Sequence, residues 1–382
     1  MTPRALVVTS LEAWDDVWRR NQHLVARLLR HDPELTVLFV EPAVDATHEM
    51  RRERRIRRGA GLRNGPMLKG VAGSRLWLYQ PTKLLPRRVD PGYDARRARA
   101  ILRAAEAVGA RRPVIWINDP STAALLDAGL PTLYDITDDW TAASRSKNEL
   151  TKTIAYEETL LERAAEVVVC SPHLASLKGR TRAVHLVTNG VDLAAYEADQ
   201  PRPRDLPPGP VALYVGTLHE DRLDVELVCR TARQIGGSGS LVLLGPDALE
   251  ESSRSALVDA GVVLLGRRPH LAVPAYLQQA DVLVVPHVVD AFTESLDPIK
   301  LYEYLAAGRH VVATPVAGFR DLDPDRATIA DRARFADAVL AALEQDAPRL
   351  VPPDGLATWD RQSRLMAEVV ARVALSGAER AP

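Results

Sequence analysis

Short apolar runs and amphipathic stretches alternate along most of the chain. Near the N-terminus, apolar runs at Ala5–Thr9 and Thr36–Val40 flank the stretch Asn21–Arg30, in which leucines recur at helical spacing. A strand, a helix and a second strand in this order form a βαβ unit, whose strands are parallel. The pattern therefore predicts an α/β chain built on a parallel sheet.

The same alternation continues through the first half of the chain. The segment Lys69–Pro91, with scattered Pro and Arg, is predicted to be irregular. The further predicted helices are Tyr93–Ala110 and Glu149–Ala165, and the further strands are Val114–Asn118, Thr132–Asp135, Val167–Ser171 and Ala183–Thr188.

A proline-rich stretch divides the chain in two. Asp199–Pro210 holds five prolines and few apolar residues, which is typical of a linker. After it the alternation restarts, with strands predicted at Val211–Gly216, Leu241–Gly245, Val262–Gly266, Val282–Pro286 and His310–Thr314. Two such series predict two Rossmann-like domains that face a cleft.

Composition limits the classes of protein to consider. The 382 residues are enough for two domains, and 46% hydrophobic with 26% charged residues is typical of a globular chain. The net charge of −1 argues against a nucleic-acid binder. Cys170 and Cys229 lie far apart, which excludes a disulfide framework or a zinc site. Without an apolar stretch of about 20 residues or a leader, a cytoplasmic protein is expected.

The stretch Asp297–Gly308 carries the clearest chemistry. Asp297 can cap a helix that has Pro298 at its first position, and Gly308 can end it. The amides at such a helix start suit phosphate, and Glu303, further along, can accept hydrogen bonds from two ribose hydroxyls. This combination predicts a nucleotide site. The alternative is a capped surface helix with an exposed glutamate.

Other candidate residues follow the ends of predicted strands, where ligands bind in such sheets. Gly216 lets the backbone approach a ligand, and Arg222 offers a permanent, forked cation. Asp119, Asp138 and Asp139 are carboxylates that could orient a substrate hydroxyl, although Asp after a strand is also a common helix N-cap. His270, His287 and His310 lack metal-ligand spacing and are expected to be structural or surface residues.

Met50–Arg63 contains seven arginines and one glutamate. Such a run is usually a solvated, mobile segment. The alternative is that Arg51–Arg58 makes a peripheral contact with an anionic membrane or a phosphorylated acceptor. No aromatic residues are interleaved, which argues against nucleic acid.

The segment TESLDPIKLYEYLAAGRHVVAT resembles the donor-site signature of retaining GT-B glycosyltransferases of family four. In that signature seven residues separate a first acid from a second acid, and Glu303 matches the second. Ser295 occupies the first acid position, with Glu294 one residue earlier. Arg222 stands at the position of the family lysine, and Thr217 replaces the family arginine.

The resemblance extends to the loop after Gly266 and to the first half of the chain. The family loop that receives the nucleotide base corresponds to Arg267 or Arg268. The first half is similar to a branch related to teichuronic-acid-type transferases, in which a WD…RxQ pattern and a YDxTDDW segment recur. The matching residues here are Trp14-Asp15, Arg20-Asn21-Gln22 and Tyr134–Trp140.

The resemblance implies a GT-B fold and a glycosyltransferase that moves a sugar from a nucleotide-sugar (UDP, GDP or dTDP type) to a hydroxyl acceptor, with retention and without metal or cofactor. The acceptor could be a lipid-linked glycan or a natural product. The expected domains are an acceptor domain at 1–198, joined by a returning C-terminal helix at about 358–377, and a donor domain at 211–350. A non-hydrolysing sugar-nucleotide epimerase and a non-catalytic nucleotide-sugar-binding subunit are the alternatives.

The candidate residues fall into three sets. The catalytic candidates are Asp138, Asp139, Asp119 and Arg222; the donor-binding candidates are Gly216, Thr217, Arg222, Arg267, Glu294, Ser295, Asp297, Ile299, Lys300 and Glu303; the acceptor-binding candidates are Trp14, Arg20 and Gln22. No metal ligand is expected among them.

Overall fold

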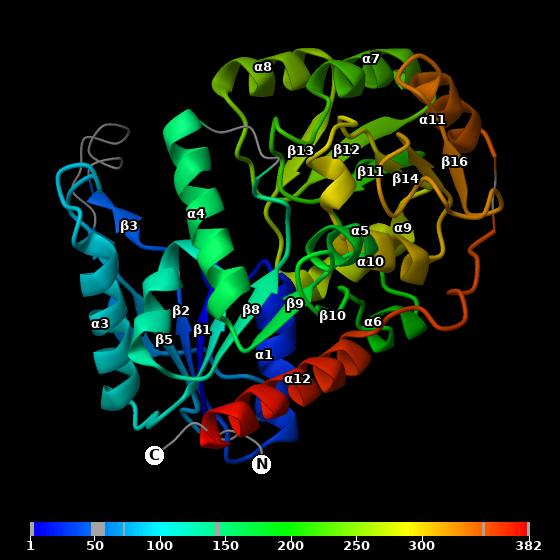
Figure 1. The fold of residues 1–382 in the computed structure, drawn as a ribbon. Coiled ribbons are helices and arrows are strands. Elements are labelled where there is room, and N and C mark those ends of the chain that lie inside the picture. Colours follow the sequence, from blue (N-terminus) through cyan, green and yellow to red (C-terminus); the bar gives the residue numbers. More distant parts are fainter. Residues whose placement is uncertain (1–3, 47–57, 72, 142–145, 346–347, 380–382) are drawn as a thin grey trace. The chain divides into compact units, whose positions relative to one another are not determined.

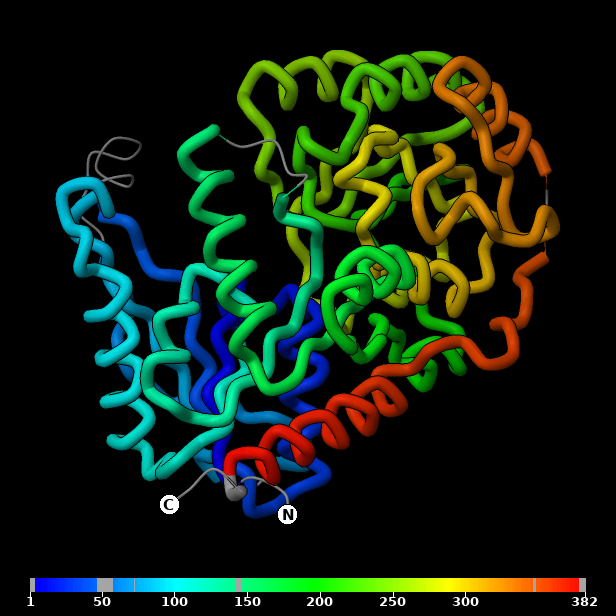
Figure 2. The backbone as a smooth tube through the Cα atoms, in the orientation of Figure 1, coloured from blue at the N-terminus to red at the C-terminus, as the bar shows by residue number. Residues whose placement is uncertain are grey.

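The apolar runs of the sequence become the strands of two separate sheets in the computed structural model, which describes residues 4–46, 58–71, 73–141, 146–345 and 348–379. The chain divides into two compact units (Figures 1 and 2). Unit 1 comprises Met1–Asp15, Arg19–Thr188 and Asp360–Pro382, and unit 2 comprises Asp16–Trp18 and Asn189–Trp359.

Unit 1 is built on an eight-stranded sheet of order β10-β9-β8-β7-β1-β2-β5-β4, in which only β4 runs antiparallel. Its strands are β1 (Ala5–Thr9), β2 (Thr36–Val40), β4 (Gly61–Asn64), β5 (Leu76–Gln80), β7 (Val114–Ile117), β8 (Thr132–Ile136), β9 (Glu166–Val169) and β10 (His185–Leu186), and the short strands β3 (Val44–Asp45) and β6 (Thr82–Lys83) pair separately. Its helices are α1 (Arg20–His31), α3 (Tyr93–Ala107), the 3-10 helix η1 (Pro120–Ala128), α4 (Lys147–Arg163), α5 (Pro172–Lys178) and α12 (Trp359–Glu379).

One face of the unit 1 sheet packs against α3, η1, α4 and α5 in a single apolar cluster. Strand residues of the alternate parity, such as Leu6, Phe39 and Trp116, are buried on the other face. The helix α12 belongs to unit 1 from Asp360 on, and Asp360 accepts a hydrogen bond from Arg27 of α1 at 2.7 Å. The predicted C-terminal helix is therefore present and packs on the first unit.

Unit 2 is a six-stranded, fully parallel sheet of order β13-β12-β11-β14-β15-β16 with helices on both faces. Its strands are β11 (Val211–Val215), β12 (Ser240–Leu244), β13 (Val263–Gly266), β14 (Val282–Val285), β15 (Val311–Ala313) and β16 (Ala327–Ile329). Its helices are α6 (Ala194–Glu197), α7 (Val225–Ile235), α8 (Glu251–Asp259), η2 (His270–Ala272), α9 (Val273–Gln279), η3 (Thr293–Ser295), α10 (Ile299–Ala307) and α11 (Phe335–Leu343).

The order of strands reverses at one place in each sheet. In unit 1 this switch point lies between β1 and β7, and in unit 2 it lies between β11 and β14. At such a point the loops after two neighbouring strands lead away in opposite directions, which leaves a crevice at the carboxyl ends of the strands.

Two sequence expectations in unit 1 are wrong. Lys69–Pro91 is not irregular, because Leu76–Gln80 forms β5 between β2 and β4. Leu76 and Leu78 are buried on one face, a period of two that the surrounding Pro and Arg residues obscured. The end of the arginine-rich stretch is also ordered, because Gly61–Asn64 is the edge strand β4.

The predicted linker at Asp199–Pro210 is packed against unit 2. Gln200 receives a hydrogen bond from Gln279 and donates one to Gln278, at 2.7 and 2.9 Å, and Leu206 is buried in the core. The predicted domain limit at residue 198 accordingly falls inside unit 2, which begins at Asn189. The proline content correctly predicted that this segment has no regular secondary structure. It did not predict that hydrogen bonds and the buried Leu206 hold the segment against unit 2.

A buried ion pair ties α1 to the sheet of unit 1. Arg20 donates from Nε and Nη2 to the two carboxylate oxygens of Asp135, each at 3.1 Å, and from Nη1 to the carbonyl of Thr188 at 3.1 Å. Trp116 adds a hydrogen bond to Asp135 at 3.2 Å. Both side chains are almost fully buried, so removing either charge leaves the other uncompensated.

We therefore expect Arg20→Met to lower the free energy of unfolding by about 3–5 kcal/mol, because Asp135 would remain buried without its partner. The exposed pair Arg163–Asp127 provides the matched control, since Arg163→Met should cost less than about 1 kcal/mol. Urea denaturation followed by circular dichroism measures both. Equal losses in the two variants would contradict a structural role for Arg20.

Candidate functional site

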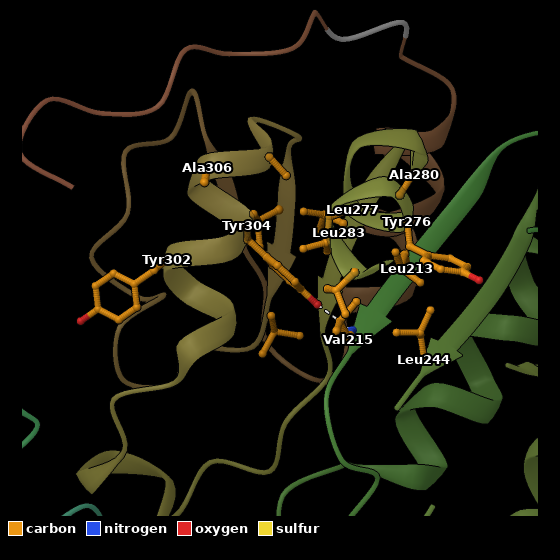
Figure 3. Packing of buried hydrophobic residues seen from close by; sticks show 14 of the residues in the cluster. Leu213, Val215, Leu244, Tyr276, Leu277, Ala280, Leu283, Tyr302, Tyr304 and Ala306 are labelled. Atoms are coloured by element: carbon orange, nitrogen blue, oxygen red, sulfur yellow. Dashed lines mark hydrogen bonds between the residues drawn. The ribbon is translucent and has the colours of Figure 1, made fainter. Parts of the chain in front are cut away.

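The helix α10 is attached to the switch point of unit 2 by a tyrosine hydroxyl (Figure 3). β11 and β14 pair only at Ala212 and Leu213, so the two strands separate toward their carboxyl ends. The Tyr304 hydroxyl lies in this gap, where it accepts a hydrogen bond from the Val215 amide at 2.9 Å and donates to the Val284 carbonyl at 3.4 Å. This arrangement places the outer face of α10 beside the crevice.

Lys300 lies at the centre of the side chains gathered there. Its Nζ is 3.2 Å from Nε2 of His287 and 3.9 Å from the centre of the Tyr214 ring. A Cβ added to Gly216 would come within 2.9 Å of the same Nζ, and Gly216 has φ +149°, which side-chain-bearing residues rarely adopt. Glycine is therefore required at this position both for its backbone conformation and for its close contact with Lys300.

Arg222 adds a second cation to this group. Its guanidinium lies over the Phe292 ring at 5.4 Å, and its backbone carbonyl accepts from Val288 at 2.8 Å. Its Nε is buried without a hydrogen-bond partner among the described residues. This Nε lies 3.9 Å from a carboxylate oxygen of Asp221. The two cations thus lie at the carboxyl ends of β11 and β14 without a close ion pair in the described part of the chain.

Burial and like charge oppose further positive charge at this site. Burial, with Lys300 and Arg222 nearby, holds the pKa of His287 well below its usual range. Burial also lowers the pKa of Lys300, and Arg222 adds to that effect while Glu303 opposes it. Because Nε2 of His287 faces the Lys300 amine, the imidazole is neutral and Nε2 is the acceptor. The site as described is short of negative charge.

Glu303 lies one helical turn from Lys300 on α10. Among the described residues no group hydrogen-bonds its carboxylate, and burial raises its pKa from the ordinary 4.5 to about 7, although Lys300 opposes the shift. Its hydrogen-bonding capacity is therefore available to a ligand.

The structure separates the donor-binding candidates into two groups. Gly216, Thr217, Arg222, Ile299, Lys300 and Glu303 are brought together around the switch point, and Arg267 is exposed at the end of β13. Glu294 is instead ion-paired with Arg320, and the buried Ser295 hydroxyl donates to the Phe292 carbonyl at 2.8 Å. The two candidates for the first acid are thus engaged in local contacts.

Asp297 does not cap α10, which corrects the sequence expectation. The N-cap is Pro298, and no side chain caps the helix. The Asp297 carboxylate instead accepts from the Asn189 amide at 2.5 Å and from the Tyr302 hydroxyl at 2.6 Å. Asp297 therefore anchors the start of unit 2 to the loop before α10. Gly308, in contrast, ends the helix in the left-handed conformation, as predicted.

The candidates in unit 1 are mostly held in packing contacts. Gln22 is fully buried and forms a capping box with Arg19 at the start of α1. Trp14 packs edge-on against Phe39, with ring centres 4.9 Å apart. Together with the Arg20–Asp135 pair, these contacts give the three acceptor-binding candidates structural partners.

Two of the three aspartates are also engaged. Asp119 caps η1 through the Ser121 amide at 2.9 Å and accepts from Arg97 at 3.0 Å, which is the helix-capping alternative. Asp139 lies in a buried cluster with Lys178 and accepts from the Thr141 hydroxyl at 2.6 Å. Asp138 is half-buried and accepts from the Thr137 hydroxyl at 3.1 Å.

The sequence analysis missed His287 and Tyr214 as residues of the site. His287 was expected to be structural or a surface residue, yet it contacts both Tyr214, at 3.1 Å, and Lys300. It directly follows the predicted strand Val282–Pro286, so the rule that strand ends carry site residues could have identified it. Lack of metal-ligand spacing was the wrong criterion for it.

The raised pKa of Glu303 predicts a pH-dependent stability. The folded state binds this proton more tightly than the unfolded state does, so the stabilisation is complete below about pH 4.5 and is lost as the pH rises through about 7. Relative to Glu303→Gln, the wild type should lose about 1–3 kcal/mol of unfolding free energy between pH 5 and pH 8. Urea titrations at both pH values measure this, with the exposed Glu344→Gln as control for loss of a carboxylate. A pH-independent difference would contradict the assignment.

Comparison with known proteins relates the unit that contains the candidate site to glycosyltransferases. The family model described as Glycosyl transferases group 1 matches residues 209–345, which hold the site. TuaH of Bacillus subtilis (strain 168), named as a teichuronic acid biosynthesis glycosyltransferase, is 26% identical over 198 residues, covering 48% of this chain and 50% of its own length. The amylovoran biosynthesis glycosyltransferase AmsK of Erwinia amylovora is 30% identical over 100 residues, covering 25% of this chain and 24% of its own length. The matches therefore span at most half of these relatives.

Solved structures match over almost the whole chain. The OtsA apo structure superposes with a TM-score of 0.62 and 13% identity, covering 98% of this chain and 97% of its own. Anabaena Alr3699/HepE in complex with UDP-glucose superposes with a TM-score of 0.60 and 14% identity, covering 98% of each chain. The chain therefore has the GT-B fold that the resemblance implied, and residues 209–345 match the model described as Glycosyl transferases group 1.

Proposed function

We propose that this protein is a glycosyltransferase that moves a sugar from a nucleotide-sugar donor to a hydroxyl acceptor, with retention and without metal or cofactor. The observation that carries the proposal is the pair of cations at the switch point of unit 2: Lys300, which lies against Gly216, and Arg222, whose charge acts on Lys300. A diphosphate would supply the negative charge that the described site lacks. The nucleotide-sugar named with HepE, UDP-glucose, supports a donor of this class.

In this proposal each side chain has a role in the departure of the nucleoside diphosphate. Arg222 and Lys300 stabilise charge that grows on the diphosphate oxygens as the glycosidic bond breaks. The Gly216 backbone lets the phosphates approach, and the first amides of α10 add donors. Glu303 accepts hydrogen bonds from the ribose hydroxyls, and Arg267 stacks on the base. His287 holds the Lys300 amine in position.

Acceptor positioning belongs to unit 1 in the same proposal. The half-buried Asp138, which accepts a hydrogen bond from the neighbouring Thr137, is the proposed group for orienting an acceptor hydroxyl. Asp119 and Asp139 contribute as fixed charges through Arg97 and Lys178.

We also propose a cytoplasmic protein with a peripheral contact to anionic membrane through Arg51–Arg58. All but Arg58 of this run lies outside the described residues. No helix in the described ranges is long and apolar enough to cross a bilayer. In support, Leu84, Leu85 and Val89 are 59%, 48% and 67% exposed on one turn that also carries the exposed Arg88. Exposed aliphatic side chains next to arginines suit the lipid interface.

The test of the proposed function is Arg222→Ala. After thermal shift with UDP, GDP and dTDP identifies the nucleotide, the rate of diphosphate release from the matching sugar nucleotide should fall roughly ten- to a thousandfold, the scale of one lost transition-state donor. Arg222→Lys should recover part of the rate, because a cation remains. The exposed Arg233→Ala is the control. Full activity of Arg222→Ala, or no nucleotide binding by the wild type, would refute the proposal.

The membrane contact predicts binding to vesicles that contain phosphatidylglycerol. Replacing Arg51, Arg52, Arg54 and Arg55 by Ser should remove the part of the binding that salt weakens. Leu84→Ser with Leu85→Ser should remove the part that persists at high salt. Leu271→Ser, at an 80% exposed position of unit 2, is the control for loss of a surface leucine. Equal sedimentation of all the variants and the wild type would exclude this contact.

A further inference from the structure

Unit 1 contains a cavity of about 260 Å³ to which the proposed function assigns no ligand. It lies beyond the carboxyl ends of β1, β2 and β7, next to the start of α3, and so on one side of the unit 1 switch point. The lining residues that matter here are Lys83, Arg87, Tyr93, Arg97, Asp119 and Ser121. The volume suits a small group and is too small for a whole nucleotide.

The lining has an excess of positive charge. Three cations, Lys83, Arg87 and Arg97, line the cavity together with two carboxylates, Asp45 and Asp119. Asp45 pairs with Lys83 at 2.6 Å, and Asp119 pairs with Arg97 at 3.0 Å. The partner of Arg87 is Asp94, at 2.8 Å, which does not line the cavity. The lining side chains thus carry three positive and two negative charges, and each of the three cations is paired with a carboxylate.

The groups that remain unused in this wall are hydrogen-bond donors. The Tyr93 hydroxyl and Arg97 Nε are buried without a hydrogen-bond partner in the described part of the chain, and these side chains are only 7% and 6% exposed. Ser121 accepts from Arg97 at 2.9 Å, so its own hydrogen is also available to donate. Burial raises the pKa of Tyr93, although Arg97 and Arg87 oppose the shift, so the phenol keeps its proton.

Buried donors without partners cost free energy, so a protein keeps them where a ligand or water completes their hydrogen bonds. A sugar hydroxyl both donates and accepts, whereas the groups left without a partner in this wall are donors only. An oxyanion only accepts, so it matches the unpartnered donors of Tyr93 and Arg97. The composition of the wall thus selects an anion over a neutral polyol.

We propose that this cavity binds an oxyanion, a carboxylate or a phosphate group, through Tyr93, Arg97, Ser121 and the charges of Lys83 and Arg87. Assigning that group to the acceptor rests on the proposed glycosyl transfer, whereas the binding itself does not. If both hold, the acceptor is an acidic or phosphorylated molecule.

Tyr93→Phe is the sharpest test, because it removes only the hydroxyl that has no partner. Wild-type protein is titrated with sodium phosphate and, separately, with sodium acetate, at an ionic strength matched with sodium chloride, and melting temperature is recorded. The apparent affinity for at least one of the two anions should fall roughly ten- to a hundredfold in Tyr93→Phe, since a hydrogen bond to a charged group is lost. Arg87→Gln should also weaken binding of the same anion. The titration in which Tyr93→Phe loses affinity, with phosphate or with acetate, identifies which of the two groups the cavity binds.

Phosphate could also bind to the cations of unit 2. Only the part of the rise in melting temperature that is lost in Tyr93→Phe is therefore assigned to this cavity. Tyr79→Phe, a half-buried tyrosine of β5, is the matched control and should bind like the wild type. An unchanged or raised urea midpoint shows that Tyr93→Phe folds. Equal anion affinity of Tyr93→Phe and wild type, or no stabilisation beyond that of sodium chloride, would overturn the proposal. Nucleotide binding in Tyr93→Phe should match the wild type, so failure at the donor site is seen separately.

Discussion

The candidate site depends on one hydroxyl group. β11 and β14 are neighbours in a parallel sheet but pair over only two residues, and beyond that point the Val215 amide has no strand partner. Tyr304 supplies the acceptor from α10. Because a buried amide without a partner is costly, this bond fixes the rotation and height of α10 against the sheet. Lys300 and Glu303 are then placed at the crevice on the half-buried side of the same helix, while Tyr302, Leu305 and Ala306 are buried.

The second constraint is electrostatic. Elsewhere in the described structure, buried arginines are ion-paired, as Arg20 is with Asp135 and Arg97 with Asp119. Around Gly216 the cations instead face a neutral histidine and an aromatic ring. Such an arrangement costs stability in the absence of an anion, and the lowered pKa of Lys300 reflects that cost. A fold retains it where a negatively charged ligand completes the site, which is the physical basis of the proposed donor site.

The acceptor-binding candidates of unit 1 have packing and hydrogen-bond partners within that unit. Trp14, Arg20 and Gln22 were selected because they follow the first strand, where ligands bind in parallel sheets. That rule predicts at which edge of the sheet a ligand binds, but not which side chains at that edge point toward the ligand and which pack into the protein. Arg20 turns toward Asp135 on β8, and Gln22 closes the first turn of α1. The cavity at the same edge is lined instead by Tyr93 and Arg97 of α3, which carry no local motif.

The sequence by itself determined the alternation of strands and helices, the two parallel sheets, and the position of α10, the helix that carries the motif predicted to bind a nucleotide. Apolar periodicity and glycine placement are local signals, so they can be recognised without knowing which strands are neighbours. Only the tertiary structure decided which charges stay unpaired. Arg20 and Asp135 are 115 residues apart, and Tyr304 reaches Val215 across 89 residues. Pairing of this kind follows from strand order and helix rotation. Asp297 and Glu303, although both belong to one motif, therefore have opposite fates: one is held by Asn189 and Tyr302, and the other is left for a ligand.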